Sequence, residues 1–316
     1  MKIVVLLHTM NGVDYIGEQL QSLIKQDICE KAELKILVRD DGSTDKTQDI
    51  LDRYKREGKI DYIQGKTVGK LKSFWQLLEE AEAADYYAFC EQDDVWFPEK
   101  LSRAVKYLET KAIIDGEEVD VAVSPLLYMS DFTVTNAKLK PVRFNRNKTM
   151  KCSDFEHSLI YSTMPGCTYV FNASARELML RFDVNRISCN NYDDLARNII
   201  YIVGDIIRDR VPTMYLRKNK SDWFYDNYYG GFLGAVKQYK ALLSGKNNNV
   251  RSSMAKGLLD TYGEGMEDVG KLEALKQVSN YAEDPVAKER LLANPKFATG
   301  SFNDKLLKTA VNSKKL

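Results

Sequence analysis

The fold is decided by the stretch Tyr86-Tyr87-Ala88-Phe89-Cys90-Glu91-Gln92-Asp93-Asp94-Val95-Trp96-Phe97-Pro98-Glu99-Lys100. An apolar, aromatic run typical of a strand ends abruptly in an acidic segment, and a helical pattern begins near Glu99. Three carboxylates at the end of one strand repel each other unless a cation lies nearby. Mg²⁺ or Mn²⁺ binds carboxylate oxygens and shares its ligand shell with substrate phosphates. The alternative is an acidic loop before a helix, with Glu99 favouring the positive helix N-terminus and Asp94 capping it.

Strands and helices alternate through the first 100 residues. The predicted strands are Ile3 to Leu7, Leu34 to Val38, Ile60 to Ile63 and Tyr86 to Cys90, with amphipathic helical patterns between them. This order predicts an α/β fold, a Rossmann-like doubly wound sheet, with a ligand crevice at the carboxyl ends of its strands. Three of those ends carry polar residues, so one crevice is expected to gather His8-Thr9, Asp40-Asp41 and Glu91 to Asp94.

The alternation loosens past residue 100. Strand-like runs occur at Val119 to Val123, Thr168 to Phe171 and Pro212 to Leu216, whereas Ser130 to Lys151 is polar with little periodicity. The run Asn190 to Asp194 precedes a predicted helix, Leu195 to Val203. From about Tyr225 onward the signals are helical, and they begin with Phe232 to Leu243. We therefore expect one domain over 1–222 and a helical C-terminal extension over 223–316.

Composition narrows the class of protein. Of the 316 residues 44% are hydrophobic, as expected for a globular chain with a substantial core, and the net charge of +1 gives no general attraction for nucleic acid. No apolar run approaches the roughly 20 residues that span a bilayer. The five cysteines form no CxxC pair, which favours a reduced, cytoplasmic compartment. The basic last helix, with Phe302, Leu306 and Leu307, suggests peripheral contact with an anionic membrane as an alternative to packing.

Two acidic motifs, in this order and at this spacing, resemble the family 2 glycosyltransferases with the GT-A fold, and most closely their bacterial rhamnosyltransferase-like branch. The matching stretches are His8 to Gly12, Ile36 to Asp45 and Glu91 to Leu101, and Gly166-Cys167-Thr168 and Asp193 also fit. The resemblance covers about the first 220 residues well. It implies a GT-A domain over 1–222, with a nucleotide-sugar-binding half at 1–100 and an acceptor half at 101–222.

The resemblance also implies a role for each matching residue. Glu91-Gln92-Asp93 stands at the DxD position, so Asp93 and Glu91 are expected to bind Mn²⁺ or Mg²⁺. The expected nucleotide pocket consists of His8, Thr9, Asn11, Glu18, Asp41, Gln92 and Asp93, where Asp41 accepts hydrogen bonds from the base. Asp193 is the expected general base, and Asp194 is the alternative. The implied reaction is metal-dependent, inverting transfer of a sugar from a UDP- or dTDP-sugar to a glycan or lipid-linked acceptor, in bacterial surface polysaccharide synthesis.

The sequence departs from the family pattern at four positions. Met10 stands where a Tyr usually lies beside the base, and Glu91 replaces an Asp. Tyr192 and Asn219 each stand where the closest branch usually has a His, and Lys218 and Lys220 offer positive charge near the second position. The departures at Met10, Tyr192 and Asn219 keep open a GT-A-like module that binds without catalysis. A nucleotidyltransferase is a second alternative, because it also uses an α/β sheet and a carboxylate-bound metal, although no glycine-rich, basic loop follows the first strand.

Some of the candidate site residues also have a purely structural interpretation. Asp40 and Asp41 precede Gly42-Ser43-Thr44, which makes a good turn without any ligand. His8 and His157 are also explained by structural roles. Trp96 is more typical of packing than of contact with an acceptor.

Overall fold

The structure is a computed structural model that describes residues 1–110, 113–114, 117–118, 124–142, 154–161, 164–189, 191–218, 249–297 and 301–316. The chain divides into two compact units. The first consists of Met1–Arg143, Pro165–Leu180 and Val203–Asn219, and the second of Phe144–Met164, Arg181–Ile202 and Lys220–Leu316. The predicted domain boundary at residue 222 lies outside the described residues and stays a prediction.

The first unit is built on a mixed sheet of eight strands in the order β3-β2-β1-β4-β9-β8-β10-β5. Strand β1 pairs in parallel with β2 and β4, and β2 in parallel with β3, whereas β9 is antiparallel to both β4 and β8. This arrangement confirms the predicted doubly wound sheet. The strands are β1 (Lys2–Thr9), β2 (Glu33–Asp40), β3 (Asp61–Gln64), β4 (Tyr86–Glu91), β5 (Val95–Trp96), β8 (Leu126–Thr135), β9 (Tyr169–Asn172) and β10 (Asp205–Arg217).

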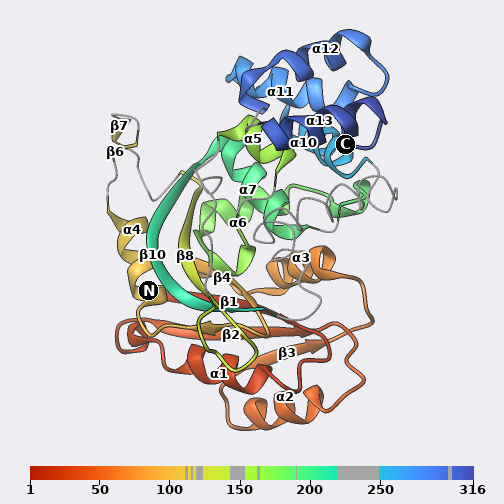
Figure 1. Cartoon of the computed structure of the whole chain (residues 1–316). Coiled ribbons are helices and arrows are strands. Elements are labelled where there is room, and N and C mark those ends of the chain that lie inside the picture. Colours follow the sequence, from red (N-terminus) through yellow and green to blue (C-terminus); the bar gives the residue numbers. More distant parts are fainter. Residues whose placement is uncertain are drawn as a thin grey trace. The chain divides into compact units, whose positions relative to one another are not determined.

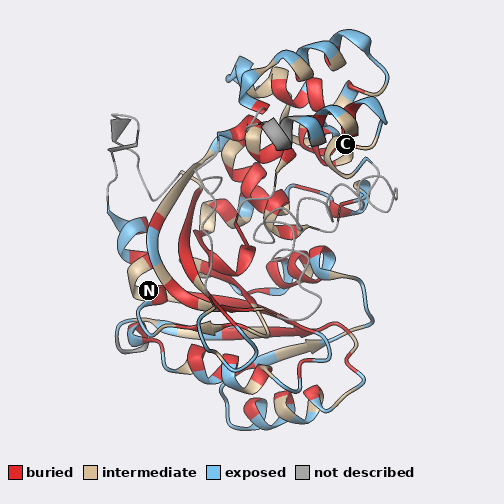
Figure 2. Ribbon diagram, viewed as in Figure 1, coloured by how far each residue is buried: buried red, intermediate tan, exposed pale blue. Residues whose placement is uncertain are grey.

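Helices cover both faces of the parallel half of this sheet. Strand β1 runs through the middle, and the residues Ile3 to Leu7 are at most 1% exposed, as expected for a strand buried on both faces. Helix α3 lies on one face and α1 and α2 on the other (Figure 1). Figure 2 shows the buried strands between exposed outer helix surfaces. The helices of this unit are α1 (Ile16–Ile24), α2 (Thr47–Arg56), α3 (Lys70–Glu80), α4 (Lys100–Glu109) and α6 (Ala173–Leu180).

Two long strands differ from the sequence prediction. Strand β8 spans a segment that was predicted in part as polar and aperiodic, and β10 begins seven residues before the predicted Pro212. Their polar residues are buried because they bond to each other across the sheet: Ser130 Oγ lies 2.6 Å from Thr213 Oγ1, and Arg208 lies 3.3 Å from Asp131. The pairing of β8 with β10 shifts register on both sides of Pro212, which has no amide hydrogen to donate.

The described part of the second unit is helical, as predicted for the end of the chain. Its helices are α5 (Phe155–Ile160), α7 (Tyr192–Val203), α10 (Val250–Tyr262), α11 (Val269–Asn280), α12 (Pro285–Ala293) and α13 (Ser301–Asn312). Aspartates cap three of them: Asp154, Asp268 and Asp284 each accept a hydrogen bond from a backbone amide of the first turn. Helix α7 begins at Tyr192, three residues before the predicted Leu195, because Asp193 and Asp194 form its first turn.

Several predictions lie outside the described residues: the strand Val119 to Val123, the helix Phe232 to Leu243, and the positions Asn190, Asn219 and Lys220. A short pair of strands, β6 (Ile113–Ile114) and β7 (Glu117–Glu118), lies apart from the main sheet. Within the described ranges no helix combines the length and the apolar character that crossing a bilayer requires.

Candidate active site

The predicted crevice forms where β2, β1 and β4 end side by side. In the parallel ladders Thr9 lies opposite Asp40, and His8 lies opposite both Arg39 and Glu91. Because parallel strands end at the same edge of the sheet, the loops that follow them lie together. The sheet order therefore brings the first acidic motif and the second to one edge of the first unit.

Gln92 ties the acidic turn to the loop after β1. Its Oε1 accepts hydrogen bonds from the Thr9 hydroxyl at 2.6 Å and from the Met10 amide at 2.8 Å. Its Nε2 donates to the Met10 carbonyl at 3.1 Å. The predicted site residues Thr9 and Gln92 thus contact each other, and Gln92 fixes the position of the acidic residues on either side of it.

Asn11 joins the loops after β1 and β2. It adopts a left-handed backbone conformation, with φ of 50°. Its side-chain Oδ1 accepts a hydrogen bond from the Thr44 backbone amide at 2.8 Å. Its backbone amide donates to the Ser43 hydroxyl, also at 2.8 Å. Asn11 therefore lies at the predicted edge, where its side chain holds two loops of the site together.

Asp41 is 1% exposed, and most of its hydrogen-bonding capacity is used within the chain. Arg39 donates to Oδ1 at 2.5 Å, and the amides of Val68 and Gly69 donate at 2.9 and 3.0 Å. A carboxylate offers about four acceptor positions, which leaves one on Oδ2. His8 Nε2 lies 3.7 Å from Asp41 Oδ2 and makes no hydrogen bond with the described part of the chain.

The electrostatics of Asp41 follow from these neighbours. Burial alone would raise the pKa of the Asp41 carboxyl. The His8 ring, Arg39 and the two amides outweigh burial and hold the pKa well below its usual range. At 3.7 Å the His8 contact is longer than a direct hydrogen bond, so we attribute most of the effect to Arg39 and the amides.

Asp40 closes the turn after β2, as the structural interpretation of this segment predicts. It is fully buried, and Oδ1 accepts hydrogen bonds from the amide and the hydroxyl of Ser43, while Gln48 donates to Oδ2. These contacts close the turn after β2. Asp40 therefore builds the turn that carries Asp41.

The carboxylates of the acidic stretch have different surroundings. Glu91 forms an ion pair of 2.5 Å with Lys70, and both side chains reach solvent. Asp93 is partly exposed. Asp94 is 2% exposed and accepts a hydrogen bond from the Arg217 amide. Burial, together with the nearby Asp93 and Glu91, raises the pKa of Asp94 well above its usual range. Asp94 thus belongs to the interior of the fold, and Glu91 and Asp93 lie at its surface.

A divalent cation fits this site if its ligands come partly from the protein and partly from a bound diphosphate. No group of three or more His, Cys, Asp or Glu residues capable of holding an ion occurs among the residues that the structure describes. The hard oxygens of Glu91 and Asp93 are the donor type that Mg²⁺ and Mn²⁺ prefer, and Mg²⁺ commonly uses one or two carboxylates plus substrate phosphates. The residues therefore fit an ion that enters together with a diphosphate.

Sequence reasoning missed Arg217 as part of this site. It singled out Lys218 and Lys220, but Arg217 has the buried guanidinium, whose side chain is 3% exposed. Its Nη2 pairs with Glu18 Oε2 at 2.5 Å, and its Nε donates to the Asp93 carbonyl at 2.9 Å. The available signal was that Arg217 is the first residue of the basic run Arg217 to Lys220 and directly follows the predicted strand Pro212 to Leu216. Glu18, which stays a predicted residue of the nucleotide pocket, is the partner of this arginine.

The two candidate bases lie in the second unit and differ sharply. Asp194 is fully buried, and its two oxygens pair with Arg197 at 2.8 Å and Arg251 at 2.9 Å. Asp193 is partly exposed in the first turn of α7, where its Oδ1 accepts a hydrogen bond from the Asp194 amide. The contacts give Asp194 a role inside the unit and favour Asp193 as the base.

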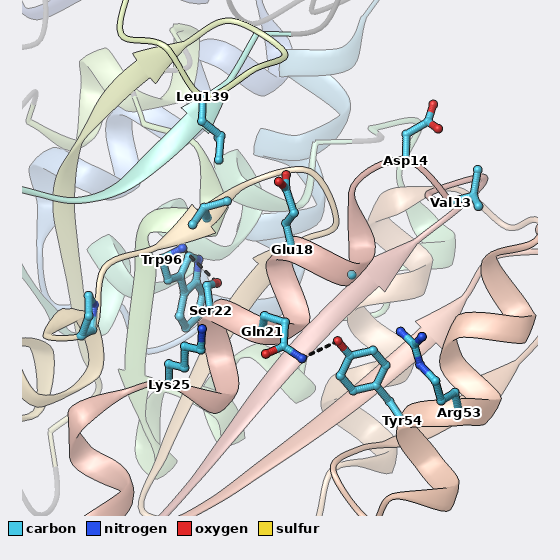
Figure 3. A pocket seen from close by; sticks show the side chains of 13 residues that line it. Val13, Asp14, Glu18, Gln21, Ser22, Lys25, Arg53, Tyr54, Trp96 and Leu139 are labelled. Atoms are coloured by element: carbon cyan, nitrogen blue, oxygen red, sulfur yellow. Dashed lines mark hydrogen bonds between the residues drawn. The ribbon is translucent and has the colours of Figure 1, made fainter.

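A separate cleft of about 680 Å³ lies along the outer face of α1 (Figure 3). It is lined by α1, by Arg53 and Tyr54 of α2, and by Trp96 and Pro98. Among the predicted site residues Glu18 alone lines it. In Figure 3 a hydrogen bond joins Gln21 to Tyr54, and Ser22 holds the backbone of Trp96. Trp96 is 2% exposed, which agrees with its predicted packing role.

Comparison with known proteins identifies a matching family and several relatives of this chain. The model of glycosyl transferase family 2 matches residues 4–169. The dTDP-rhamnosyl transferase RfbG of Shigella flexneri is 26% identical over 267 residues, which is 78% of this chain and 82% of RfbG. The poly(ribitol-phosphate) beta-N-acetylglucosaminyltransferase TarS of Staphylococcus aureus is 33% identical over 111 residues, which is 34% of this chain but 19% of TarS.

Solved structures show the same fold. TarS 1–349 of S. aureus in complex with UDP-GlcNAc aligns with a TM-score of 0.56 at 18% identity, covering 94% of this chain and 78% of TarS 1–349. The mannosyltransferase PcManGT of Pyrobaculum calidifontis, in complex with GDP-Man and Mn²⁺, aligns with a TM-score of 0.52 at 15% identity, covering 98% and 79%. The mixed sheet, its acidic strand ends and the family match lead to one conclusion: the chain belongs to glycosyl transferase family 2 and is a glycosyltransferase with the GT-A fold.

Proposed function

We propose that this glycosyltransferase moves a sugar from a UDP- or dTDP-sugar to a glycan or lipid-linked acceptor, with a divalent cation and with inversion at the anomeric carbon. The observation that carries the proposal is the edge where β2, β1 and β4 end, with Thr9 and Asp41 beside Gln92 and the Glu91–Asp93 pair. That edge offers polar groups to the pyrimidine base of a nucleotide, and carboxylates to the metal ion that would bind its diphosphate.

Nucleotide recognition is assigned to residues 1–100. The remaining acceptor position on Asp41 Oδ2 and the unbonded Nε2 of His8 form a polar pair that suits the edge of a pyrimidine base. The backbone of Met10 is fixed by Gln92 from both sides, and its side chain is 38% exposed. Met10 thus offers the base an apolar surface in place of the aromatic ring usual in the family.

The diphosphate is assigned to the acidic turn. Glu91 and Asp93 would hold Mn²⁺ or Mg²⁺, which supplies Lewis-acid stabilisation of charge on the departing diphosphate. Lys70, paired with Glu91 at 2.5 Å, adds a positive charge at the same edge. The relative RfbG is named for a dTDP-sugar and TarS was solved with UDP-GlcNAc, and these names support a pyrimidine diphosphate.

The proton of the acceptor hydroxyl is assigned to Asp193. As the acceptor oxygen forms its bond to the anomeric carbon, the carbon–oxygen bond to the diphosphate breaks and the diphosphate keeps the electron pair. A carboxylate oxygen of Asp193 takes the proton. With one base and no enzyme nucleophile, a single displacement inverts the anomeric carbon.

The acceptor is assigned to residues 101–222, with 223–316 as a helical extension. Two relatives are named for surface-type acceptors: poly(ribitol-phosphate) for TarS, and GlcNAc-diphosphoundecaprenol for WfaP of Escherichia coli. These names support a role in bacterial surface polysaccharide synthesis. Work on a lipid-linked acceptor would place the protein in the cytoplasm at the inner face of the membrane.

The test is a thermal-shift panel with UDP, dTDP, GDP and CMP, each with Mn²⁺ and with EDTA. A ligand that binds the native protein at 100 times its Kd stabilises it by about 2.7 kcal/mol. We expect a metal-dependent rise in Tm with one pyrimidine diphosphate, and loss of the metal-dependent part in Asp93→Asn. Asp40→Asn, in the adjacent turn, serves as the control that keeps the metal dependence. No shift with any nucleotide would refute the donor site.

A further inference from the structure

Arg217 connects four segments that are far apart in the sequence. Its Nη2 pairs with Glu18 on α1 at 2.5 Å, and its Nη1 donates to the carbonyl of Ala137. Its Nε donates to the Asp93 carbonyl at 2.9 Å, and its amide donates to Asp94 Oδ1 at 3.3 Å. All of these residues lie in the first unit. One side chain at the end of β10 therefore holds α1, the acidic turn and the turn at Ala137.

The surroundings of the guanidinium make its position well defined. The Arg217 side chain is 3% exposed, and its guanidinium lies over the Tyr15 ring, 4.9 Å from the ring centre. The planar fork of arginine donates in several fixed directions at once, which the single ammonium of lysine cannot do. Glu18 reaches it from the surface, with a side chain that is 57% exposed.

The contacts fix the acidic turn on both sides of the proposed metal ligand. Gln92 is bonded to Thr9 and Met10, and Asp94 and the carbonyl of Asp93 are bonded to Arg217. The backbone of Asp93 is thereby held from residue 92 to residue 94, which fixes the point and the direction in which its Cα–Cβ bond leaves the turn. Partners that orient a metal ligand in this way commonly change metal affinity or activity 10- to 100-fold when they are replaced.

We infer that Arg217, held by Glu18, is the positioning residue that aims Asp93 at the metal-bound diphosphate. This inference rests on the proposed function, and it deepens that function at the same site. It also gives Glu18 a role in anchoring Arg217, because its carboxylate pairs with the guanidinium.

The test measures Mn²⁺ binding to the UDP- or dTDP-saturated protein by electron paramagnetic resonance, which requires no turnover. The variants are Arg217→Lys, Glu18→Gln and the double variant. Arg208→Lys is the matched control, since Arg208 lies on the same strand and pairs with Asp131 away from the acidic turn. Nucleotide affinity in EDTA and thermal unfolding are measured beside it.

We expect Arg217→Lys to weaken Mn²⁺ binding about 10- to 100-fold, with nucleotide affinity in EDTA unchanged. Glu18→Gln, at an exposed position that tolerates substitution, should shift Mn²⁺ binding in the same direction by less. The double variant should match Arg217→Lys, because the two residues act as one unit. Arg208→Lys should bind Mn²⁺ as wild type does.

The outcomes separate the inference from the function beneath it. Wild-type protein that binds neither nucleotide nor Mn²⁺ would overturn the proposed function. Wild-type binding with unchanged Arg217→Lys and Glu18→Gln would overturn the inference alone. An equal loss of affinity in EDTA, or an equal effect of Arg208→Lys, would also overturn it, because either result shows general damage in place of positioning.

Discussion

At the residue scale, adjacent aspartates have different roles within one motif. In Asp93-Asp94 and in Asp193-Asp194 the second residue is buried and bonded inside its unit, and the first is partly exposed. In these two pairs the buried carboxylate is bonded to cations or amides within the fold, whereas metal binding and proton transfer need a carboxylate that a substrate can reach. The pattern agrees with the proposed metal role of Asp93 and the proposed base role of Asp193.

The Asp193-Asp194 pair yields a prediction with opposite outcomes. Asp193→Ala should abolish turnover and keep nucleotide binding, with a stability cost of about 1 kcal/mol for the lost hydrogen bond from the Asp194 amide. Asp194→Ala leaves Arg197 and Arg251 without the carboxylate between them, and breaking such a buried pair costs about 3–5 kcal/mol. Urea unfolding and single-turnover transfer measure the two effects. Full turnover in Asp193→Ala would return the base role to another residue.

At the element scale, the N-terminus of α3 depends on Asp41. The amides of Val68 and Gly69 immediately before this helix both donate to the Asp41 carboxylate. Gly69 has φ of 89°, a conformation that glycine adopts without strain, and this geometry turns the chain into the helix. A negative charge here also favours the positive end of the helix dipole. Asp41 therefore joins β2 to α3, apart from any contact with a base.

This contact predicts how stability depends on pH. The pKa of Asp41 is lower in the folded state than in the unfolded chain, so the unfolded chain takes up the proton first as pH falls. Its stabilisation is complete above the unfolded pKa near 4, decreases as pH falls below about 5, and is fully lost only below the much lower pKa of the folded state. Asp41→Asn should cost about 2 kcal/mol at pH 7, and its difference in unfolding free energy from wild type should shrink steadily as pH falls from about 5 to 2. Parallel curves over this range, measured by urea unfolding, would contradict the assignment.

The strands of the sheet differ in how far the sequence alone predicts them. Strands β1 and β4 were predictable because each carries a continuous apolar run that is buried on both faces, and β2 was predictable from its shorter apolar run Ile36 to Val38. Strand β8 and the part of β10 before Pro212 were not predicted, because polar residues of these strands bond to each other across the sheet, as Ser130 bonds to Thr213. The acidic motifs located Asp41 and Asp93. The Glu18–Arg217 pair joins residues 199 apart, and no local pattern indicates such a contact.

At the scale of the whole molecule, the proposed reaction draws on residues of both units. The proposed donor and metal residues, Asp41, Gln92 and Asp93, belong to the first unit, and the proposed base Asp193 to the second. Each unit has its own buried core, with Leu6 and Phe89 in the first and Leu258 and Leu275 in the second. Donor binding is therefore separable from proton transfer, which agrees with the contrast expected for Asp193→Ala.

Hydrogen exchange tests this division directly. With UDP or dTDP and Mn²⁺ at 100 times the Kd, the amides that follow β1, β2 and β4 should exchange more slowly, by up to about 100-fold where opening requires release of the ligand. The amides of α10 and α11 should keep the exchange rates of the free protein, because the donor residues lie outside their unit. Asp93→Asn with the same nucleotide is the control, and it should lose the metal-dependent part of the protection after β4. Slower exchange in α10 and α11 on donor binding would show that the two units respond together, and the donor site would then have to include residues of the second unit.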